Sequence, residues 1–376
     1  MENPDVISLT RELIAFNSVN PPGNEAEIAL FLASLLSGHG FKVSTPEFGE
    51  NRLHLIAEKG ISASMPPIVF SGHLDTVPLG KREWKQHPFG GQVIGDRLFG
   101  RGSSDMKSGV AAMSIAAIET SRDGAIEGGV RLIFSAAEEL GCQGIKQLAE
   151  NHDLGEARAI VVGEPTANIP AIGHKGALYL RGETFGKTAH SSMPSMGENA
   201  IYKAARCIAR IEKLRFKAAE DPLLGQPTIN VGQIEGGMNI NSVPDHAEFT
   251  MDIRSTTRLS HQEILDQLHV ELGGELQIET LVDMQAVSTS ESDPFIKKVC
   301  KICGIASKDK QWRRALPYLT DGSVLQAAYG GVPTIILGPG QVTMAHQTDE
   351  FCYIQDILKA VDLYKEIIQI RRKRDE

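Results

Sequence analysis

The sequence predicts a two-part protein, in which an α/β domain with a mostly parallel sheet is interrupted by a smaller α+β domain. Short apolar runs such as 68–72 and 130–135 alternate with helix-like segments, as in a sheet that is covered on both faces. After Pro170, apolar and polar residues alternate, which is typical of strands with one solvated face. The helix–strand alternation resumes near residue 288. We therefore expect a larger α/β domain at 1–175 and 286–376, with an inserted domain at 176–285.

The first part of the chain opens with two predicted helices, at 5–18 and 24–39. The second begins after Asn24 and ends at glycines, residues that favour helix ends. Apolar runs then predict strands at 42–43, 53–57, 68–72, 130–135 and 160–162. Between them, longer segments predict helices at 107–120 and 143–151.

The inserted domain is expected to contain four alternating strands and two amphipathic helices. In chain order these are strand 178–183, helix 200–214, strands 228–234 and 247–253, helix 261–272 and strand 276–281. This order matches the split βαβ pattern of a ferredoxin-like sandwich. The last part of the chain then adds a helix at 294–303, a strand at 334–337 and a helix at 354–371.

Composition and charge exclude several classes of protein. The chain has 376 residues, a net charge of −9 and 41% hydrophobic residues. The negative charge argues against a nucleic-acid or anionic-membrane partner, and the longest apolar stretch, 110–118, is too short to span a bilayer. Five scattered cysteines and an acidic start without an apolar run predict a cytoplasmic protein. Cys300 and Cys303 form a C-x-x-C pattern on a predicted helix, which favours packing over a metal or redox pair.

Histidine and carboxylate side chains lie where buried apolar strands would end, and Asp105 follows the glycine-rich segment 100–104. These residues are His73, Asp75, Asp105, Glu138, Glu139, Glu164 and His346. One such residue would be assigned to capping or to a surface hydrogen bond, but seven in these positions favour a common site. Buried carboxylates need a partner, and imidazole with carboxylate is a ligand set for divalent metals. The pattern therefore predicts a metallohydrolase.

Five of these residues are the expected metal ligands: His73, Asp105, Glu139, Glu164 and His346. Each of two Zn²⁺ ions would receive one histidine, one terminal carboxylate and a shared carboxylate, leaving an open position for water or substrate. Asp105 is the expected bridge, because it lies in a glycine-rich segment where the backbone can approach closely. The ions would then lie roughly 3.5–4 Å apart.

The other two residues have expected catalytic roles. Asp75 lies two residues after His73, so on an extended segment both side chains face the same way. Asp75 would then accept the second ring N–H of His73 and fix its tautomer. Glu138 neighbours a ligand but is not one, and we expect it to act as the general base that takes a proton from water.

The segments 73–77, 100–107 and 138–139 resemble the signatures of the dinuclear-zinc aminoacylase, carboxypeptidase and deacylase family. The segment 163–166 resembles its acetylornithine deacetylase and succinyl-diaminopimelate desuccinylase branch. This resemblance implies a catalytic domain interrupted by a lid domain that mediates dimerisation, and the same ligand and base roles. It also implies a cis peptide bond after Asp105.

Three residues of the inserted domain gain a role through this resemblance. The segment 186–192 is similar to the one whose histidine crosses the dimer to stabilise the oxyanion, which implies that role for His190. The segments 236–241 and 251–254 resemble those that supply a polar contact and a carboxylate-binding arginine, here Asn241 and Arg254. Without the resemblance, His190 would be assigned to a surface loop and Arg254 to the solvated face of a strand.

The expected activity is metal-dependent hydrolysis of the amide bond of an N-acyl amino acid, with Zn²⁺ or Co²⁺ as the cofactor. The segments 174–176, 251–254 and 338–350 look closer to acetylornithine deacetylases, which predicts a deacetylase of amino-acid biosynthesis. The small sheet of the inserted domain leaves an edge that must be covered, which predicts a homodimer through that domain. The alternatives are a succinyl-diaminopimelate desuccinylase, towards which Gly322 points, and a dipeptidase or carboxypeptidase of the same family. A non-catalytic binding protein on this fold would lack a ligand or the base, and none is missing.

Overall fold

A computed structural model describes residues 5–124, 126–305 and 315–370 of the chain. The chain forms two compact units. The first is built from Met1–Gly173, Ser288–Leu316 and Thr320–Glu376, and the second from His174–Val287 with Pro317–Leu319. The expected insertion, 176–285, lies within the second unit. The short segment Pro317–Leu319 was expected in the catalytic domain, because three residues carry no periodic signal.

The first unit contains a six-stranded sheet in the order β1-β4-β8-β5-β9-β17. Its strands, in the same order, are Lys42–Ser44, Leu55–Lys59, Val130–Ser135, Ile68–His73, Ala159–Val162 and Thr334–Ile336. The pairs β5–β8, β5–β9 and β9–β17 are parallel, whereas β1–β4 and β4–β8 are antiparallel. Every residue of β5 and β8 is buried, which explains why these strands show no polar alternation. The predicted mostly parallel sheet is confirmed.

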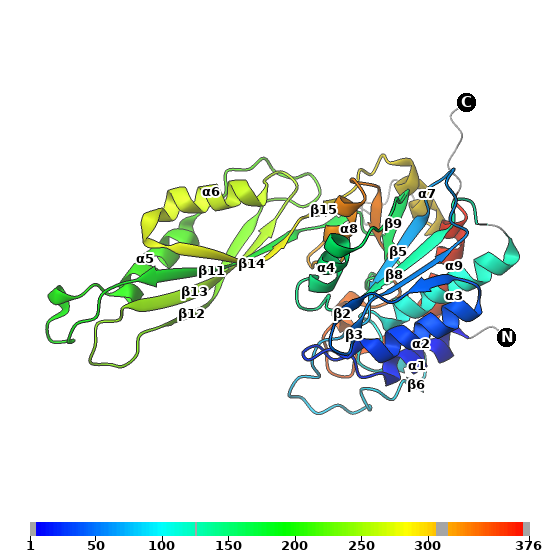
Figure 1. The fold of residues 1–376 in the computed structure, drawn as a ribbon, viewed down its shortest axis with the longest axis horizontal. Helices are drawn as coiled ribbons and strands as arrows, with labels where there is room; N and C mark the ends of the chain where they lie inside the picture. The colour runs from blue at the N-terminus through cyan, green and yellow to red at the C-terminus, as the bar shows by residue number, and fades with distance from the viewer. Residues whose placement is uncertain (1–4, 125, 306–314, 371–376) are drawn as a thin grey trace. The chain divides into compact units, whose positions relative to one another are not determined.

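Helices lie on both faces of this sheet (Figure 1). They are α1 Val6–Ala15, α2 Glu25–Gly38, α3 Lys107–Asp123, α4 Gln143–Asn151, α7 Pro294–Ile302, α8 Gly322–Ala328 and α9 Ile354–Ile368. Phe70 of β5 packs edge-on against Tyr364 of α9, with ring centroids 5.4 Å apart. A Cβ at Gly72 would lie 2.6 Å from the Met106 side chain, so glycine allows α3 to approach the sheet. The expected end of α9 at Arg371 lies outside the described residues.

Several short strands went unpredicted. The predicted strand 53–57 is interrupted at His54, which separates β3 (Arg52–Leu53) from β4; β3 pairs with β2 (Glu47–Gly49). A three-stranded sheet joins β6 (Gln92–Ile94), β7 (Arg97–Phe99) and β18 (Phe351–Tyr353). Three more short strands, β10 (Gly173–His174), β15 (Val287–Ser288) and β16 (Ala315–Leu316), also form a sheet. The β7–β18 pairing brings the segment before residue 351 alongside the glycine-rich segment after residue 99.

The second unit is a four-stranded antiparallel sheet with two helices, as predicted for a ferredoxin-like sandwich. The strands are β11 Gly176–Phe185, β12 Thr228–Gly236, β13 His246–Ser255 and β14 Gln277–Met284, in the order β12-β13-β11-β14. The helices are α5 Ala200–Lys213 and α6 His261–Leu272, and α6 begins with a capping box between Ser260 and Glu263. Alternate residues such as Leu178, Leu180 and Phe249 form a core with both helices.

The cysteines of the chain are all free thiols in the structure. Cys300 is buried in α7 and Cys303 follows that helix, which supports packing roles for the C-x-x-C pair. Among the described residues, no helix combines the length and the apolar character needed to cross a membrane.

Candidate active site

Two sets of three possible metal ligands lie side by side in the first unit and share Asp105. One set is His73, Asp105 and Glu164, and the other is Asp105, Glu139 and His346; within each set the ligand atoms lie within 4.8 Å of one another. His73 Nε2 is 3.1 Å from Asp105 Oδ1, and His346 Nε2 is 3.5 Å from Asp105 Oδ2. One oxygen of Asp105 therefore faces each histidine, as in a carboxylate that bridges two cations. The structure thus brings all five predicted ligands together.

The chemistry of this cluster fits divalent cations. The Oε1 atom of Glu139 is buried and has no hydrogen-bond partner among the described residues. Burial, followed by the charge of Asp105, raises the pKa of Glu164 well above its usual range and also raises the pKa of Glu139. The carboxylates destabilise one another as anions, since like charges share a desolvated space. Two bound cations would remove this cost and give the unpaired oxygen a partner.

Asp105 is presented by the turn between β7 and α3. The peptide bond between Asp105 and Met106 is cis, as the family resemblance implied. The buried carboxylate of Glu350 accepts backbone N–H groups from Gly102 at 3.0 Å, Ser104 at 2.8 Å and Asp105 at 3.0 Å. It is thereby positioned to hold the whole turn.

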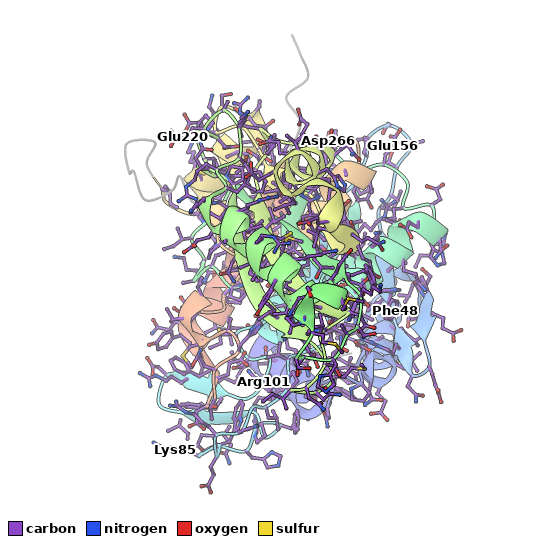
Figure 2. The ribbon with its side chains drawn as sticks, turned by 90° about the vertical axis from the view of Figure 1, so that its left-hand side faces the viewer. Phe48, Lys85, Arg101, Glu156, Glu220 and Asp266 are labelled. Atoms are coloured by element: carbon purple, nitrogen blue, oxygen red, sulfur yellow. The ribbon has the colours of Figure 1, made fainter. Side chains whose placement is uncertain are left out.

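Glu350 is paired with a buried arginine. Arg101 Nη1 donates to Glu350 Oε2 at 2.6 Å, and both side chains are almost fully enclosed (Arg101 is labelled in Figure 2). Burial raises the pKa of Glu350 to about 7, although Arg101 opposes the shift. In the sequence, Glu350 belongs to the segment 338–350 that resembles acetylornithine deacetylases, but no role was predicted for it. Nothing in its local pattern distinguishes it from a surface glutamate.

The contacts of Asp75 differ from those expected. His73 Nδ1 is 2.9 Å from the backbone oxygen of Asp75 but 3.7 Å from its carboxylate oxygen Oδ1. The nearer acceptor that fixes the ring is therefore the main chain of residue 75. The carboxylate instead accepts the backbone N–H groups of Glu138 at 3.0 Å and Glu139 at 3.2 Å, and a side-chain N–H of Asn20 at 2.8 Å. Asp75 thus ties the end of β5 to the turn that follows β8.

Glu138 lies in a buried, acidic environment beside the ligand cluster. Burial raises its pKa well above the usual range; His73 opposes this shift, whereas Glu139 and Asp321 add to it. Cys142 Sγ lies 3.4 Å from Glu138 Oε1. A carboxylate that binds a proton more readily than usual suits a group that must both accept and return one.

Asp321 is a second buried carboxylate near Glu138 that sequence reasoning missed as a site residue. Its pKa is raised to about 7, mainly by burial, and the Ser135 hydroxyl donates to its Oδ2 atom. Glu138, Cys142 and Asp321 offer ligand-type atoms within 4.8 Å of one another. Asp321 precedes α8, where an aspartate is an ordinary helix-start residue, so its position alone gave no signal.

His190 and Asn241 come from two adjacent loops of the second unit. His190 is exposed and forms an isolated β-bridge with Ser242, and the Ser191 N–H donates to the Asn241 backbone oxygen at 3.1 Å. His190 Nδ1 accepts the Ser192 backbone N–H at 3.2 Å. The ring proton is therefore left to Nε2, which can act as a hydrogen-bond donor.

Arg254 lies near the end of β13, on the face of the sheet opposite the helices. Its Nε atom is 2.9 Å from Asp252 Oδ1, and its Nη2 atom donates to the Tyr179 hydroxyl at 2.9 Å. The guanidinium is thus held in a fixed orientation on the strand, half-buried. A fixed planar fork suits bidentate recognition of a carboxylate.

His54 gives the first unit a pH-dependent stability. It is fully buried, its Nδ1 atom accepts the Ala136 N–H at 3.1 Å, and burial lowers its pKa from 6.5 to about 4. The unfolded chain therefore binds a proton first as the pH falls, so His54 contributes full stability above pH 6.5 and loses it towards pH 4. We expect the metal-free protein to lose about 2 kcal/mol through His54 between pH 8 and pH 5.

The measurement is urea unfolding of the metal-free wild type and the His54→Asn variant at both pH values. Asparagine offers an acceptor oxygen without titrating, so the stability gap between the two proteins should narrow at pH 5. A gap that stays constant would show that His54 is not buried in its neutral form.

Comparison with known proteins finds similarity along most of the chain. The model of the family named Peptidase family M20/M25/M40 matches residues 69–370. A Staphylococcus epidermidis protein named as a probable succinyl-diaminopimelate desuccinylase is 29% identical over 402 residues, covering 98% of each chain. An acetylornithine deacetylase from Vibrio cholerae is 27% identical over 388 residues, covering 98% of this chain and 99% of the relative.

The fold is also found among solved structures. A metallo-carboxypeptidase of the M20 family from Sulfolobus solfataricus superposes with a TM-score of 0.79 over 97% of this chain and 99% of that chain. Because the two sequences are only 20% identical, this match shows a shared fold and nothing about the substrate.

Proposed function

Since the chain belongs to peptidase family M20/M25/M40, we propose that it hydrolyses the amide bond of an N-acetylated amino acid such as N-acetylornithine. It is a metal-dependent amidohydrolase of the acyl-amino-acid kind. The observation that carries the proposal is the sharing of Asp105 between two ligand sets beside the buried Glu138. A single metal or a purely structural cluster would not need a carboxylate with one oxygen facing each of two histidines.

The residues of the site have separate tasks in this reaction. His73 and Glu164 would hold one cation, Glu139 and His346 the other, and Asp105 both. When bound, the two ions would supply a polarised water and a Lewis acid for the scissile carbonyl, with Zn²⁺ as the proposed metal and Co²⁺ as a substitute.

The proton and the substrate are handled by protein side chains. Glu138 takes a proton from the attacking water and returns it to the leaving amine, so that the amide C–N bond breaks to a carboxylate and an amine. His190 donates from Nε2 to the developing oxyanion. Arg254 binds the α-carboxylate of the amino acid, and Asn241 adds a polar contact.

The choice of acyl group is the finer part of the proposal. The relatives named above include both a desuccinylase and an acetylornithine deacetylase, so they support the substrate class without choosing within it. The resemblance of 174–176, 251–254 and 338–350 to acetylornithine deacetylases favours acetyl.

A substrate panel tests this choice. The zinc- or cobalt-loaded protein is assayed with N-acetyl and N-succinyl amino acids beside dipeptides, and the largest kcat/KM is expected for an N-acetyl amino acid. A preference for N-succinyl-diaminopimelate would overturn the acetyl assignment, and a preference for dipeptides would favour the peptidase alternative. Hydrolysis of none of them would overturn the proposal as a whole.

The proposed assembly is a homodimer through the second unit. Strands β12 and β14 are the edges of its sheet, and β12 is exposed along most of its length. An open edge of this kind is usually covered, and a two-fold symmetric pairing with a second copy would cover it. His190 would then serve the active site of the neighbouring subunit.

Mixing two inactive variants tests the delivery of His190 in trans. The His190→Ala and Glu138→Ala proteins are each expected to be nearly inactive, and their mixture should recover activity as subunits exchange. A hybrid dimer would contain one site with both groups intact. If labelled subunits exchange but no activity returns, His190 does not act across the dimer.

A cytoplasmic location is the remaining part of the proposal. The five cysteines, all free, suit a reducing compartment. Fusion to a fluorescent protein would test the location directly.

A further inference from the structure

The turn that carries Glu138 and Glu139 is held by side chains from three distant parts of the chain. Its four consecutive backbone N–H groups, from residues 136–139, each donate to a buried side chain. Ala136 donates to His54 Nδ1 at 3.1 Å, and Ala137 donates to Glu25 Oε1 at 3.3 Å. The last two donate to the carboxylate of Asp75. Buried backbone N–H groups are almost always paired, and past the end of β8 side chains supply all four of these partners.

The conformation of this turn needs support. Ala137 has a φ of 55°, in the left-handed region that L-residues rarely adopt because Cβ comes close to the backbone. On the other side of the turn, the backbone oxygen of Glu138 accepts the backbone N–H groups of Gly141 and Cys142, at 2.9 and 2.7 Å. A Cβ at Gly144 would lie 1.7 Å from the Ala136 oxygen, so the start of α4 packs directly on the turn. The direction of the two carboxylates is therefore set by backbone contacts on both sides.

Glu25 is the least expected member of this arrangement. It is fully buried in the first turn of α2, although a buried carboxylate is costly to desolvate. Arg52 meets it with two hydrogen bonds, Nη2 to Oε1 at 2.5 Å and Nε to Oε2 at 2.8 Å. The Phe48 ring covers the guanidinium, whose central carbon lies 4.9 Å from the ring centroid (Phe48 is labelled in Figure 2).

A buried ion pair of this kind contributes little net stability, because the attraction between the charges is offset by desolvation. Its geometric effect is different. The fork of Arg52 fixes both oxygens of Glu25, so that Oε1 faces the Ala137 N–H. Removing one partner would leave the other charge buried and would free the turn at its left-handed residue.

We propose that Glu25, oriented by Arg52, is a positioning residue for the turn at 136–139 and so for the carboxylates of Glu138 and Glu139. It acts through the Ala137 backbone, and its catalytic consequence rests on the proposed function. When Glu25 is lost, Ala137 relaxes towards the right-handed region and the two carboxylates rotate out of alignment. Misalignment of a base by about 1 Å is enough to slow a reaction on the order of 100-fold.

The chain offers a matched control for this proposal. Glu58 and Arg131 form a second, partly buried glutamate–arginine pair on strands β4 and β8, with Arg131 Nε 2.7 Å from Glu58 Oε1. Arg131 lies near the start of β8, whereas the turn at 136–139 follows the end of that strand. The Glu25→Gln and Glu58→Gln variants therefore each remove one negative charge from a glutamate–arginine pair, one pair near the turn that follows β8 and the other near the start of that strand.

The kinetic test compares these two variants in the metal-loaded protein. Glu25→Gln should lower kcat by on the order of 10-fold to 100-fold with little change in KM, whereas Glu58→Gln should leave kcat within about twofold of wild type. Arg52→Lys, which keeps the charge but loses the fork, should give an intermediate kcat. Equal losses in Glu25→Gln and Glu58→Gln would show a general effect of stability and overturn the proposal. If Glu25→Gln does not fold, Arg52→Lys against Arg131→Lys makes the same comparison.

Amide hydrogen exchange tests the proposal without any substrate. Exchange at residues 136–142 should be faster in Glu25→Gln and unchanged in Glu58→Gln. Unchanged exchange in both variants would overturn the positioning role even if kcat falls. If the wild type hydrolyses no substrate of the panel, the proposed function fails, while the exchange result still decides whether Glu25 holds the turn.

Discussion

Replacing Glu138 with Gln is expected to lower kcat by on the order of 10³-fold while the bound metal stays at the wild-type level. Glutamine has nearly the same shape but cannot take a proton from water at neutral pH. Glu138 is not a member of either ligand set that contains Asp105, so its loss should leave both intact. The measurement is steady-state kinetics on the metal-loaded variant together with its metal content.

Glu156→Gln is the matched control, because Glu156 is an exposed glutamate of the same unit. It should have wild-type kcat and metal content. Glu138→Ala extends the test, since alanine removes every polar atom of the base. Near-wild-type turnover in a metal-loaded Glu138→Ala protein would show that Glu138 is not the general base.

Replacing Asp105 with Asn is expected to weaken both metal ions together, by at least about 100-fold in affinity each. One oxygen of Asp105 faces His73 and the other faces His346, so a single change removes a ligand from both sets. The amide has one acceptor oxygen and no charge, and its NH₂ group would face one of the two cations. Hydrolysis should fall with the metal.

A variant of a ligand that belongs to only one set distinguishes the role of Asp105 from that of an ordinary ligand. Glu164→Gln should weaken the ion held with His73 and spare most of the affinity of the ion held with Glu139 and His346. Calorimetric titration of metal-stripped protein with Zn²⁺ measures both events. If Asp105→Asn loses one ion and keeps the other at wild-type affinity, Asp105 does not bridge them.

The sequence was sufficient to predict the parallel sheet, the inserted sandwich and the cluster of metal-ligand side chains. His73, Glu139 and Glu164 were readable because imidazole and carboxylate groups at the ends of buried strands conflict with hydrophobic burial. The ferredoxin-like unit was readable because its strands alternate clearly and its helices have regular apolar spacing. In both cases the signal lies within a few neighbouring residues.

The residues that position the turns of the site could not be predicted from local sequence patterns. Glu25 is 112 residues from Ala137, His54 is 82 residues from Ala136, and Glu350 is 245 residues from Asp105. Each accepts a backbone N–H group, and a backbone donor leaves no trace in residue type. Glu25 reads as an ordinary acidic residue in the first turn of a helix, where the dipole favours it.

The contacts of Asp75 also could not be predicted from its neighbours in the sequence. Its spacing from His73 correctly placed both residues together, but two residues on an extended segment offer both a backbone and a side-chain acceptor. The choice between them depends on the turn at 138–139, which competes for the carboxylate. Only the folded arrangement of both segments decides it.

The most direct test of a shared-carboxylate, two-ion site is a zinc titration of the metal-stripped wild-type protein, with hydrolysis of an N-acyl amino acid followed in parallel. We predict two binding events per chain and amide hydrolysis that appears as the sites fill. A protein that binds no zinc, cobalt or manganese, or one that hydrolyses the substrate equally well when stripped of metal, would contradict the account.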